Sequence, residues 1–370
     1  MKRILIRNNW KLDGGVENVT HNLVMYLAEQ GYDVTVVGDQ CRRVDFYQSY
    51  PKCVKYFKTI LFPDRGARKT LRWFLTGVMN KANRVLYKCF LKTHFDVAIA
   101  MKEGHCMQEL NAVNADKKFA WVHVDYNFLH WTSCCFRSDE EELQCMQKYD
   151  KVVCVSQAAC DSVKNTIGDP GNLCVRYNPL DIKRIKMLSD CDGEMAKRDN
   201  RPILVSVGRL VQQKNYQLLL YVCAELQKKY QFEMWIIGEG PDRAELEKII
   251  DGEDLKCVKL FGKKDNPYSY IKQADIYVSS AVWESYGLAI QEALILGVPV
   301  VAVKCPAIEE TFDTQFGLLT NNSFEELYAA VEKMIVDEAF RQECKDHIRE
   351  HYCVQDLYEK RLKEICDLWE

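Results

Sequence analysis

Two acidic residues, Glu284 and Glu292, are the side chains most clearly spaced for chemistry in this sequence. They stand in the segment WESYGLAIQEA with seven residues between them. The segment predicts a helix that begins near Gly287, so Glu292 lies on its second turn and Glu284 in the loop before it. A helix N-terminus offers free N–H groups and partial positive charge that suit a phosphate. Carboxylates on either side would fit a diphosphate between hydroxyl-rich ends, as in a nucleotide-sugar, although an ordinary acidic helix gives the same spacing.

Two cations, Arg209 and Lys214, form a second candidate group upstream of these acids. They stand in VSVGRLVQQKN, directly after a predicted strand. Ligands of open α/β sheets bind outside the carboxyl ends of the strands. A planar guanidinium and a compact ammonium at that edge suit a diphosphate. Loops often carry Arg and Lys, so this pair alone does not define a ligand.

The first half of the chain places further candidates after predicted strands. Gly14 and Gly15 open a helix, where the backbone can approach a ligand or simply form a tight turn. The run is not G-x-G-x-x-G, so the dinucleotide fingerprint is missing. His123 and Asp125 follow another strand, where a lone histidine is commonly a structural hydrogen-bonding residue. Glu103 follows a further strand and is a candidate acceptor contact.

Short apolar runs that alternate with helical patterns must position these groups. The runs predict buried parallel strands at residues 4–6, 34–37, 97–100, 119–122 and 152–155, and again at 203–207, 233–237, 258–261, 276–279 and 298–303. Helical periodicity separates them, for example at 16–30, 215–229, 242–250 and 287–296. This alternation predicts an α/β fold with two doubly wound parallel sheets.

A polar segment, LSDCDGEMAKRDNRP, separates the two series of strands and indicates a linker within residues 181–201. It predicts a first domain at 1–185 and a second at 186–353. Residues 354–370 have the pattern of an amphipathic helix, whose destination periodicity does not give.

Composition narrows the class of protein. The 370 residues, 48% of them apolar, are enough for two cores, and the net charge of −3 argues against a nucleic-acid binder. The sequence has neither a membrane-spanning run nor a signal peptide, so we expect a cytoplasmic protein. Seventeen scattered cysteines without a C-x-x-C pair indicate buried reduced thiols. The spelling Asp190-Cys191-Asp192 falls in the linker, and we expect no metal site there.

The segment IYVSSAVWESYGLAIQEALILGVPVVA resembles the signature of the retaining glycosyltransferases of the GT4 family, which have the GT-B fold. The family pattern is E-x7-E with an aromatic-Gly pair, here Tyr286–Gly287, and a G-x-P-V-V strand, here starting at Gly297. Ser285 replaces the first glycine of the common E-G-F-G form, which leaves the sugar preference open. VSVGRLVQQKN is similar to the family's G-R-L-x-x-x-K-(G/N) pattern, in the expected order.

The resemblance implies two Rossmann-like domains with an interdomain cleft, and a last helix that crosses back to the first domain. The catalytic residues that it implies are Arg209 and Lys214 on the departing diphosphate, Glu284 on the donor sugar and His123 near the reacting sugar. The donor-binding residues that it implies are Glu292 on the ribose, Lys263 beside the base, and Gly14, Gly15, Tyr286, Gly287 and Leu288 around the phosphates. Asp125 and Glu103 are the acceptor-side candidates.

These roles imply a retaining, metal-independent hexosyltransferase that needs no cofactor. It would move a sugar from a nucleotide-sugar, expected to be a UDP-sugar, to a hydroxyl of a glycan or lipid-linked acceptor in surface polysaccharide biosynthesis. Two alternatives stay open. One is a non-hydrolysing nucleotide-sugar epimerase, which would need an acid/base set that we do not find. The other is a catalytically inactive nucleotide-sugar-binding subunit, although the intact set of two cations and two acids argues against it.

A basic segment lies between Lys52 and Lys92, with eleven Lys or Arg residues and one acid, Asp64. Apolar residues repeat within it at helical spacing, which predicts a basic amphipathic helix. Such a helix would dock on the inner, anionic face of a membrane, where a lipid-linked acceptor is found. The alternative is a helix packed on its own sheet with a solvated cationic face. No motif for nucleic acid accompanies the charge.

Overall fold

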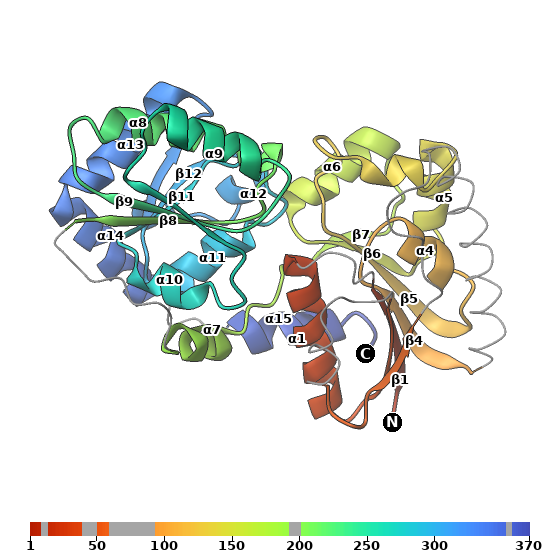
Figure 1. Cartoon of the computed structure of the whole chain (residues 1–370). Coiled ribbons are helices and arrows are strands. Elements are labelled where there is room, and N and C mark those ends of the chain that lie inside the picture. The colour runs from red at the N-terminus through yellow and green to blue at the C-terminus, as the bar shows by residue number, and fades with distance from the viewer. Residues whose placement is uncertain (9–13, 39–49, 59–92, 192–200, 353–356) are drawn as a thin grey trace. The chain divides into compact units, whose positions relative to one another are not determined.

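The computed structural model describes residues 1–8, 14–38, 50–58, 93–191, 201–352 and 357–370. These residues divide into two compact units (Figure 1). Unit 1 comprises Met1–Leu180 together with Leu357–Glu370, and unit 2 comprises Asp181–Asp356. Each unit has its own parallel sheet with helices packed around it, so the predicted α/β fold is confirmed.

Seven described strands form the sheet of unit 1, in the order β3-β2-β1-β4-β5-β6-β7. All the pairings between these strands are parallel. The chain order reverses between β1 and β4, which is where ligands bind in doubly wound sheets. The strands are β1 (Arg3–Asn8), β2 (Asp33–Gly38), β3 (Lys55–Lys58), β4 (Phe95–Ala100), β5 (Ala115–Val122), β6 (Lys151–Cys154) and β7 (Leu173–Val175).

Two helices of unit 1 begin at a serine that caps them. Ser138 accepts a hydrogen bond from the Glu141 N–H at the start of α5, and Ser156 accepts one from Ala159 at the start of α6. Such caps satisfy backbone donors that a helix leaves unpaired. The described helices are α1 (Gly15–Glu29), α4 (His105–Leu110), α5 (Asp139–Met146), α6 (Gln157–Ile167) and α15 (Leu357–Cys366), with a 3-10 turn η1 (Trp131–Cys134).

Six described strands form the sheet of unit 2, in the order β10-β9-β8-β11-β12-β13, again with parallel pairings. Here the order reverses between β8 and β11, so the loops after these two strands lie side by side at the carboxyl edge. The strands are β8 (Ile203–Val207), β9 (Glu233–Ile237), β10 (Val258–Gly262), β11 (Ile276–Ser279), β12 (Val300–Val303) and β13 (Gly317–Thr320).

Buried aliphatic side chains of the sheet and its helices make one core in unit 2. Leu219 of α8 and Val331 of α13 are fully buried in it with Leu204 of β8. The described helices are α7 (Ile182–Ser189), α8 (Tyr216–Leu226), α9 (Arg243–Gly252), α10 (Tyr268–Gln273), α11 (Leu288–Ile295), α12 (Pro306–Glu309), α13 (Phe324–Val336) and α14 (Glu338–His351).

The structure differs from the sequence prediction at the boundary between the units. Unit 2 begins at Asp181 rather than 186, and helix α7 occupies the first part of the 181–201 segment expected to contain a linker. The helix belongs to unit 2 because it packs on α10 and α11, where the Asn266 amide donates to the Leu188 carbonyl at 2.8 Å. Asp190 ends α7 and pairs with Lys272, while Asp192 lies outside the described residues.

The C-terminal helix α15 groups with unit 1. It was expected at 354–370 and is described from Leu357 to Cys366. Arg361 donates to the Asn178 carbonyl at 2.9 Å, and the Trp369 ring packs on Phe119 of β5 with centroids 5.6 Å apart. These contacts explain why the chain's last residues are part of the first unit.

Cysteines in the described part of the chain are all free thiols, and most of them are buried. Their burial fits the role of small apolar side chains in a core. Within the same part of the chain, no helix combines the length and the apolar character that crossing a bilayer would require.

Candidate active site

The structure brings the two predicted motifs of unit 2 together at the carboxyl edge of its sheet. Lys214, in the loop after β8, forms an ion pair with Glu284, in the loop after β11. Only 20% of the Lys214 side chain and 14% of the Glu284 side chain are exposed. The pair is therefore partly shielded from water, which strengthens the attraction between its charges.

Backbone contacts lock these two loops to each other. The Val282 N–H donates to the Gln213 carbonyl, and the Gln213 side chain donates to the Trp283 carbonyl, both at 2.9 Å. The Ser280 hydroxyl donates to the Lys214 carbonyl at 2.8 Å. The distance between the ammonium and the carboxylate is thus set by the backbone as well as by their charges.

Arg209 shares the loop of Lys214 but has an exposed side chain, and it forms no ion pair with the described residues. Its backbone position is fixed by the neighbouring loop after β9. The Leu210 N–H donates to the Glu239 carbonyl at 3.0 Å, and Gly238 lies so close that a Cβ there would overlap the Gly208 carbonyl. The guanidinium is consequently available to an anion from a well-anchored backbone.

Helix α11 begins at Leu288, as predicted, with Gly287 before it at φ +73°. A side chain at position 287 would be strained at this φ and would overlap Ile308, so glycine is required. The neighbouring Tyr286 is buried. Glu284 lies four residues before Leu288 in the same loop, so the ion pair with Lys214 and the free N–H groups of the helix belong to one segment.

Glu292 is half-buried on the second turn of α11, where its carboxylate accepts a hydrogen bond from the Tyr268 hydroxyl at 3.1 Å. Burial raises the pKa of Glu292 to about 7, and the Tyr268 hydrogen bond opposes that rise. A carboxyl group poised near neutrality is typical of functional sites.

The buried hydroxyl of Tyr277 donates to the Val207 carbonyl at 3.2 Å. Burial raises its pKa, and Tyr216, Glu284 and Glu292 raise it further. Both acids therefore lie within electrostatic range of one buried tyrosine on β11. Lys263 is exposed after β10, which stands two strands away from β8 in the sheet.

In unit 1, Gly14 adopts an extended backbone at φ −157° and helix α1 begins at Gly15. The carboxylate of Glu17, buried at 6% exposure, lies 3.3 Å from where a Gly14 Cβ would stand. Residues 9–13, which precede this turn, lie outside the described part of the chain. The glycines thus mark a helix start with an acid folded back over it.

His123 directly follows β5, and its Nε2 atom is buried without a hydrogen-bond partner in the described residues. Burial lowers the pKa of His123 to about 4, with Lys102 adding to the decrease and Glu103 opposing it. The imidazole is therefore neutral at physiological pH. A buried, unsatisfied ring nitrogen beside the carboxyl edge of a sheet is suited to meeting a ligand hydroxyl.

Glu103 and Asp125, expected as acceptor contacts, are both buried in unit 1. The oxygens of Glu103 accept hydrogen bonds from the His123 N–H at 3.0 Å and the Trp131 indole at 2.9 Å. Asp125 accepts from the Asn127 N–H at 3.0 Å, and burial raises its pKa. These engagements favour a supporting role for both acids over the direct contact expected from the sequence.

Several residues of the site had no signal in the sequence. Tyr268 and Tyr277 are ordinary aromatic residues of a helix and a strand, and their hydroxyl contacts join positions 24 and 70 residues apart. Gln213 stands inside a recognised motif at a variable position. Only the three-dimensional structure identifies these partners.

Comparison with known proteins agrees with this architecture. The fold resembles that of a solved Anabaena protein, HepE in complex with UDP and glucose, with a TM-score of 0.73, 16% identity, and 99% of this chain and 100% of that one covered. Two Rossmann-like units of this kind define the GT-B fold.

The family follows from the sequence matches. Residues 13–184 match the family described as Glycosyltransferase Family 4, and residues 192–351 match Glycosyl transferases group 1. The chain belongs to the GT4 family of glycosyltransferases, as its motifs had indicated.

Two relatives illustrate the match. An uncharacterized glycosyltransferase of Haemophilus influenzae is 24% identical over 363 residues, 94% of this chain and 95% of that one. A Campylobacter jejuni enzyme, named as an N-acetylgalactosaminyltransferase acting on N-acetylgalactosamine-N,N'-diacetylbacillosaminyl-diphospho-undecaprenol, is 31% identical over 192 residues, half of each chain.

Proposed function

We propose that this glycosyltransferase moves a sugar from a UDP-sugar to a hydroxyl of a lipid-linked or growing surface glycan, with retention at the anomeric carbon. The observation that carries the proposal is the convergence in unit 2 of Arg209 and the Lys214–Glu284 pair at one sheet edge. The names of two similar proteins support it, since one is solved with UDP and the other acts on a diphospho-undecaprenol glycan.

The cations supply the main chemical contribution in this proposal. As the bond between the anomeric carbon and the diphosphate oxygen breaks, negative charge grows on the departing UDP. Arg209 and Lys214 oppose that charge, and donors that are fixed in place before reaction are worth most. The Lys214 ammonium would donate hydrogen bonds to both Glu284 and the phosphate. Glu284 would accept hydrogen bonds from the donor sugar.

Retention requires the acceptor oxygen to bond on the face that the diphosphate leaves. The acceptor's proton then departs with the UDP oxygen that has just been released, so no protein nucleophile is needed. His123, neutral and with a buried nitrogen that has no hydrogen-bond partner in the described residues, would hydrogen-bond the acceptor beside that face. The main contribution of unit 1 is then orientation of the reactants.

A panel of UDP- and GDP-sugars tests this function by thermal shift and by slow hydrolysis of the donor. We expect a UDP-sugar to raise the melting temperature and to be hydrolysed, with the α- or β-configuration of the product determined by NMR. Binding without turnover would favour the inactive binding subunit, and no response to any nucleotide-sugar would contradict the proposal.

We also propose that the reaction needs no metal, because Arg209 and Lys214 would themselves neutralise the diphosphate. Activity should be unchanged in excess EDTA. A strict requirement for an added divalent ion would contradict this part of the proposal.

Association with an anionic membrane remains a proposal from the sequence, since residues 59–92 of the basic segment lie outside the described residues. Co-sedimentation with liposomes tests it. Recovery that is equal on neutral and anionic vesicles would remove the idea.

A further inference from the structure

The loop between β5 and α5, residues 123–138, has an unusual construction. Its tip carries two exposed apolar side chains, Phe128 at 49% and Leu129 at 42% exposure. Its base is held by two acids that are each only 1% exposed, Glu103 and Glu142. The loop also carries His123, so whatever fixes the loop also fixes that imidazole.

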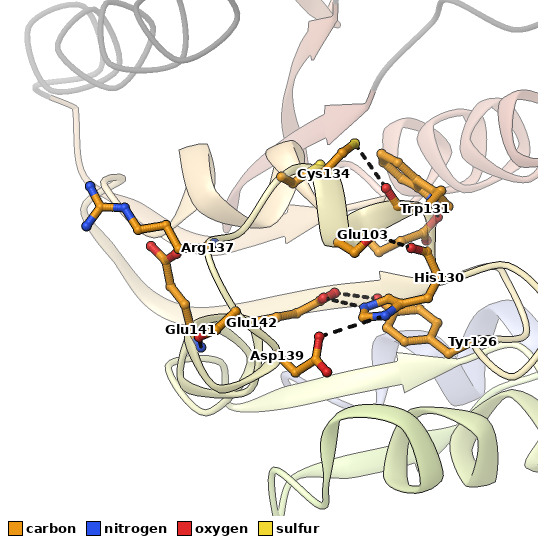
Figure 2. Close-up of polar contacts among 12 residues, drawn as sticks. Glu103, Tyr126, His130, Trp131, Cys134, Arg137, Asp139, Glu141 and Glu142 are labelled. Atoms are coloured by element: carbon orange, nitrogen blue, oxygen red, sulfur yellow. Dashed lines mark hydrogen bonds and ion pairs between the residues drawn. The ribbon is translucent and has the colours of Figure 1, made fainter. Parts of the chain in front are cut away.

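Glu142 of α5 holds the middle of the loop (Figure 2). One oxygen accepts from the Tyr126 hydroxyl at 2.7 Å and the other accepts from His130 Nε2 at 2.8 Å. The rings of Tyr126 and His130 stack with centroids 4.9 Å apart. Asp139 lies 3.9 Å from His130 Nδ1 on the other side of the ring.

Glu103 holds the same loop from the turn after β4. It accepts from the His123 backbone at one end of the segment and from the Trp131 indole at the other. Gly104, at φ +76°, makes room for this arrangement. A Cβ at that position would stand 2.9 Å from Trp131, 3.1 Å from Cys135 Sγ and 3.2 Å from Thr132.

The buried carboxylates of Glu103 and Glu142 contribute little net free energy to the stability of the fold. A buried carboxylate loses much hydration free energy, and apolar residues of similar volume often stabilise a protein as well or better. What two fully hydrogen-bonded carboxylates do provide is a single geometry for the groups that they bind. Here those groups bracket residues 123–131, which include the histidine and the apolar tip.

We propose that Glu142, through Tyr126 and His130, is a positioning residue that fixes the β5–α5 loop so that His123 and the tip at Phe128–Leu129 meet the acceptor. Glu103 fixes the other side of the same loop. The inference rests on the proposed function, because it concerns the acceptor half of that reaction. The donor half, at the edge of unit 2, should not depend on it.

The test compares Glu142→Gln, Tyr126→Phe, His130→Leu and His130→Gln in the full chain. Donor hydrolysis by water and thermal shift with UDP measure the donor half. Transfer to octyl glycosides, chosen as those that the wild type uses, measures the acceptor half. Amide hydrogen exchange over residues 123–131 measures the loop directly and needs no acceptor. His94→Leu is the matched control. His94 directly precedes β4, and its exposed ring lies 3.0 Å from the Asp116 carboxylate, so the variant removes a His–Asp pair outside the loop.

We expect Glu142→Gln and His130→Leu to lower kcat/KM for the octyl glycoside about 10- to 100-fold. UDP binding and donor hydrolysis should stay within about twofold, and exchange of the loop amides should accelerate. His130→Gln keeps an N–H donor and should recover most of the loss. His94→Leu should match the wild type.

Three results would overturn the inference. They are unchanged loop exchange in Glu142→Gln and His130→Leu, parallel losses in donor hydrolysis and transfer, and failure of His130→Gln to differ from His130→Leu. If Glu142→Gln does not fold, loop exchange and transfer in the Tyr126 and His130 variants test the inference instead. A wild type that neither binds nor hydrolyses a UDP-sugar would refute the proposed function, whereas loop exchange would still test the anchoring.

Discussion

The carboxyl edges of the two sheets are built on opposite principles. In unit 2, the charged side chains Arg209, Lys214 and Glu284 stand partly exposed on short loops that backbone hydrogen bonds hold together. In unit 1, the charged side chains Glu103 and Glu142 are buried and hold a long loop from beneath. The difference indicates that unit 2 presents charge to a ligand, whereas unit 1 uses charge to set the shape of a loop.

The strongest test of this comparison is Arg209→Ala. Transfer should fall roughly 10²- to 10³-fold, equivalent to about 2.7–4 kcal/mol of transition-state stabilisation. The melting temperature should hardly change, because an exposed side chain contributes within about 0.5 kcal/mol of stability. Steady-state kinetics and calorimetry measure the two effects. Lys228→Ala is the control, since Lys228 is an exposed cation of unit 2 paired with Glu225.

Glu292→Gln should stabilise the protein and weaken nucleotide binding at once. Burial raises the pKa of Glu292 from 4.5 to about 7, so above pH 7 the folded state carries an unfavourable buried charge. The variant removes up to about 3 kcal/mol of that destabilisation at pH 8. The gain should shrink as pH falls from 7 to 4.5, where wild-type Glu292 is protonated in the folded state. Thermal melts at a series of pH values measure it; an equal gain at pH 4.5 would contradict the burial argument.

Gly104→Ala should lower the free energy of unfolding of unit 1, because position 104 packs against the β5–α5 loop. We expect a loss of about 1–3 kcal/mol from strain at φ +76° and from the crowding with Trp131. Gly31→Ala is the matched control, because Gly31 has φ +80° and open space around its Cβ position. Denaturant melts of both variants separate strain from packing. Equal losses of unfolding free energy in the two variants would show that crowding by Trp131 adds nothing to the strain at position 104.

The smallest effect is expected at the apolar tip. Phe128→Ser with Leu129→Ser should raise KM for a long-chain alkyl glycoside roughly fivefold, about 1 kcal/mol of partly buried apolar contact. KM for a short, water-soluble glycoside should stay unchanged. Val336→Ser, at an exposed apolar position of unit 2, is the control. An equal rise in KM for the long-chain and the short glycoside would show that the tip supports folding rather than contacting the acceptor's alkyl chain.

The central part of each sheet could be predicted from the sequence because parallel strands are buried on both faces. The run at 276–279 became β11 and the run at 203–207 became β8. The strands that went unpredicted, β3, β7 and β13, all lie at a sheet edge. An edge strand pairs on one side only, and β7 has just three residues, all half-buried, which is too short a run to identify as a strand.

Sequence separation explains which residues of the site could be predicted from the sequence. Arg209 and Lys214 stand five residues apart in one loop, and Glu284 and Glu292 flank one helix start, so short motifs captured them. Glu142 binds residues 12 and 16 positions away, and the partners of Glu103 are 20 and 28 positions away. A buried acid that serves distant backbone and ring donors has no local pattern. The helix α7 was missed because it is only eight residues long and runs directly into the polar segment after Ser189.

The close approach of the loops after β8 and β9 has a consequence for engineering. A Cβ at Gly238 would overlap the Gly208 carbonyl, and one at Gly240 would overlap that of Leu210. A library aimed at a different donor can therefore vary residues 211 and 212, but it must keep glycine at positions 238 and 240 and keep Gln213, which holds the loop after β11. Randomising both loops together would fill such a library with clones that do not fold.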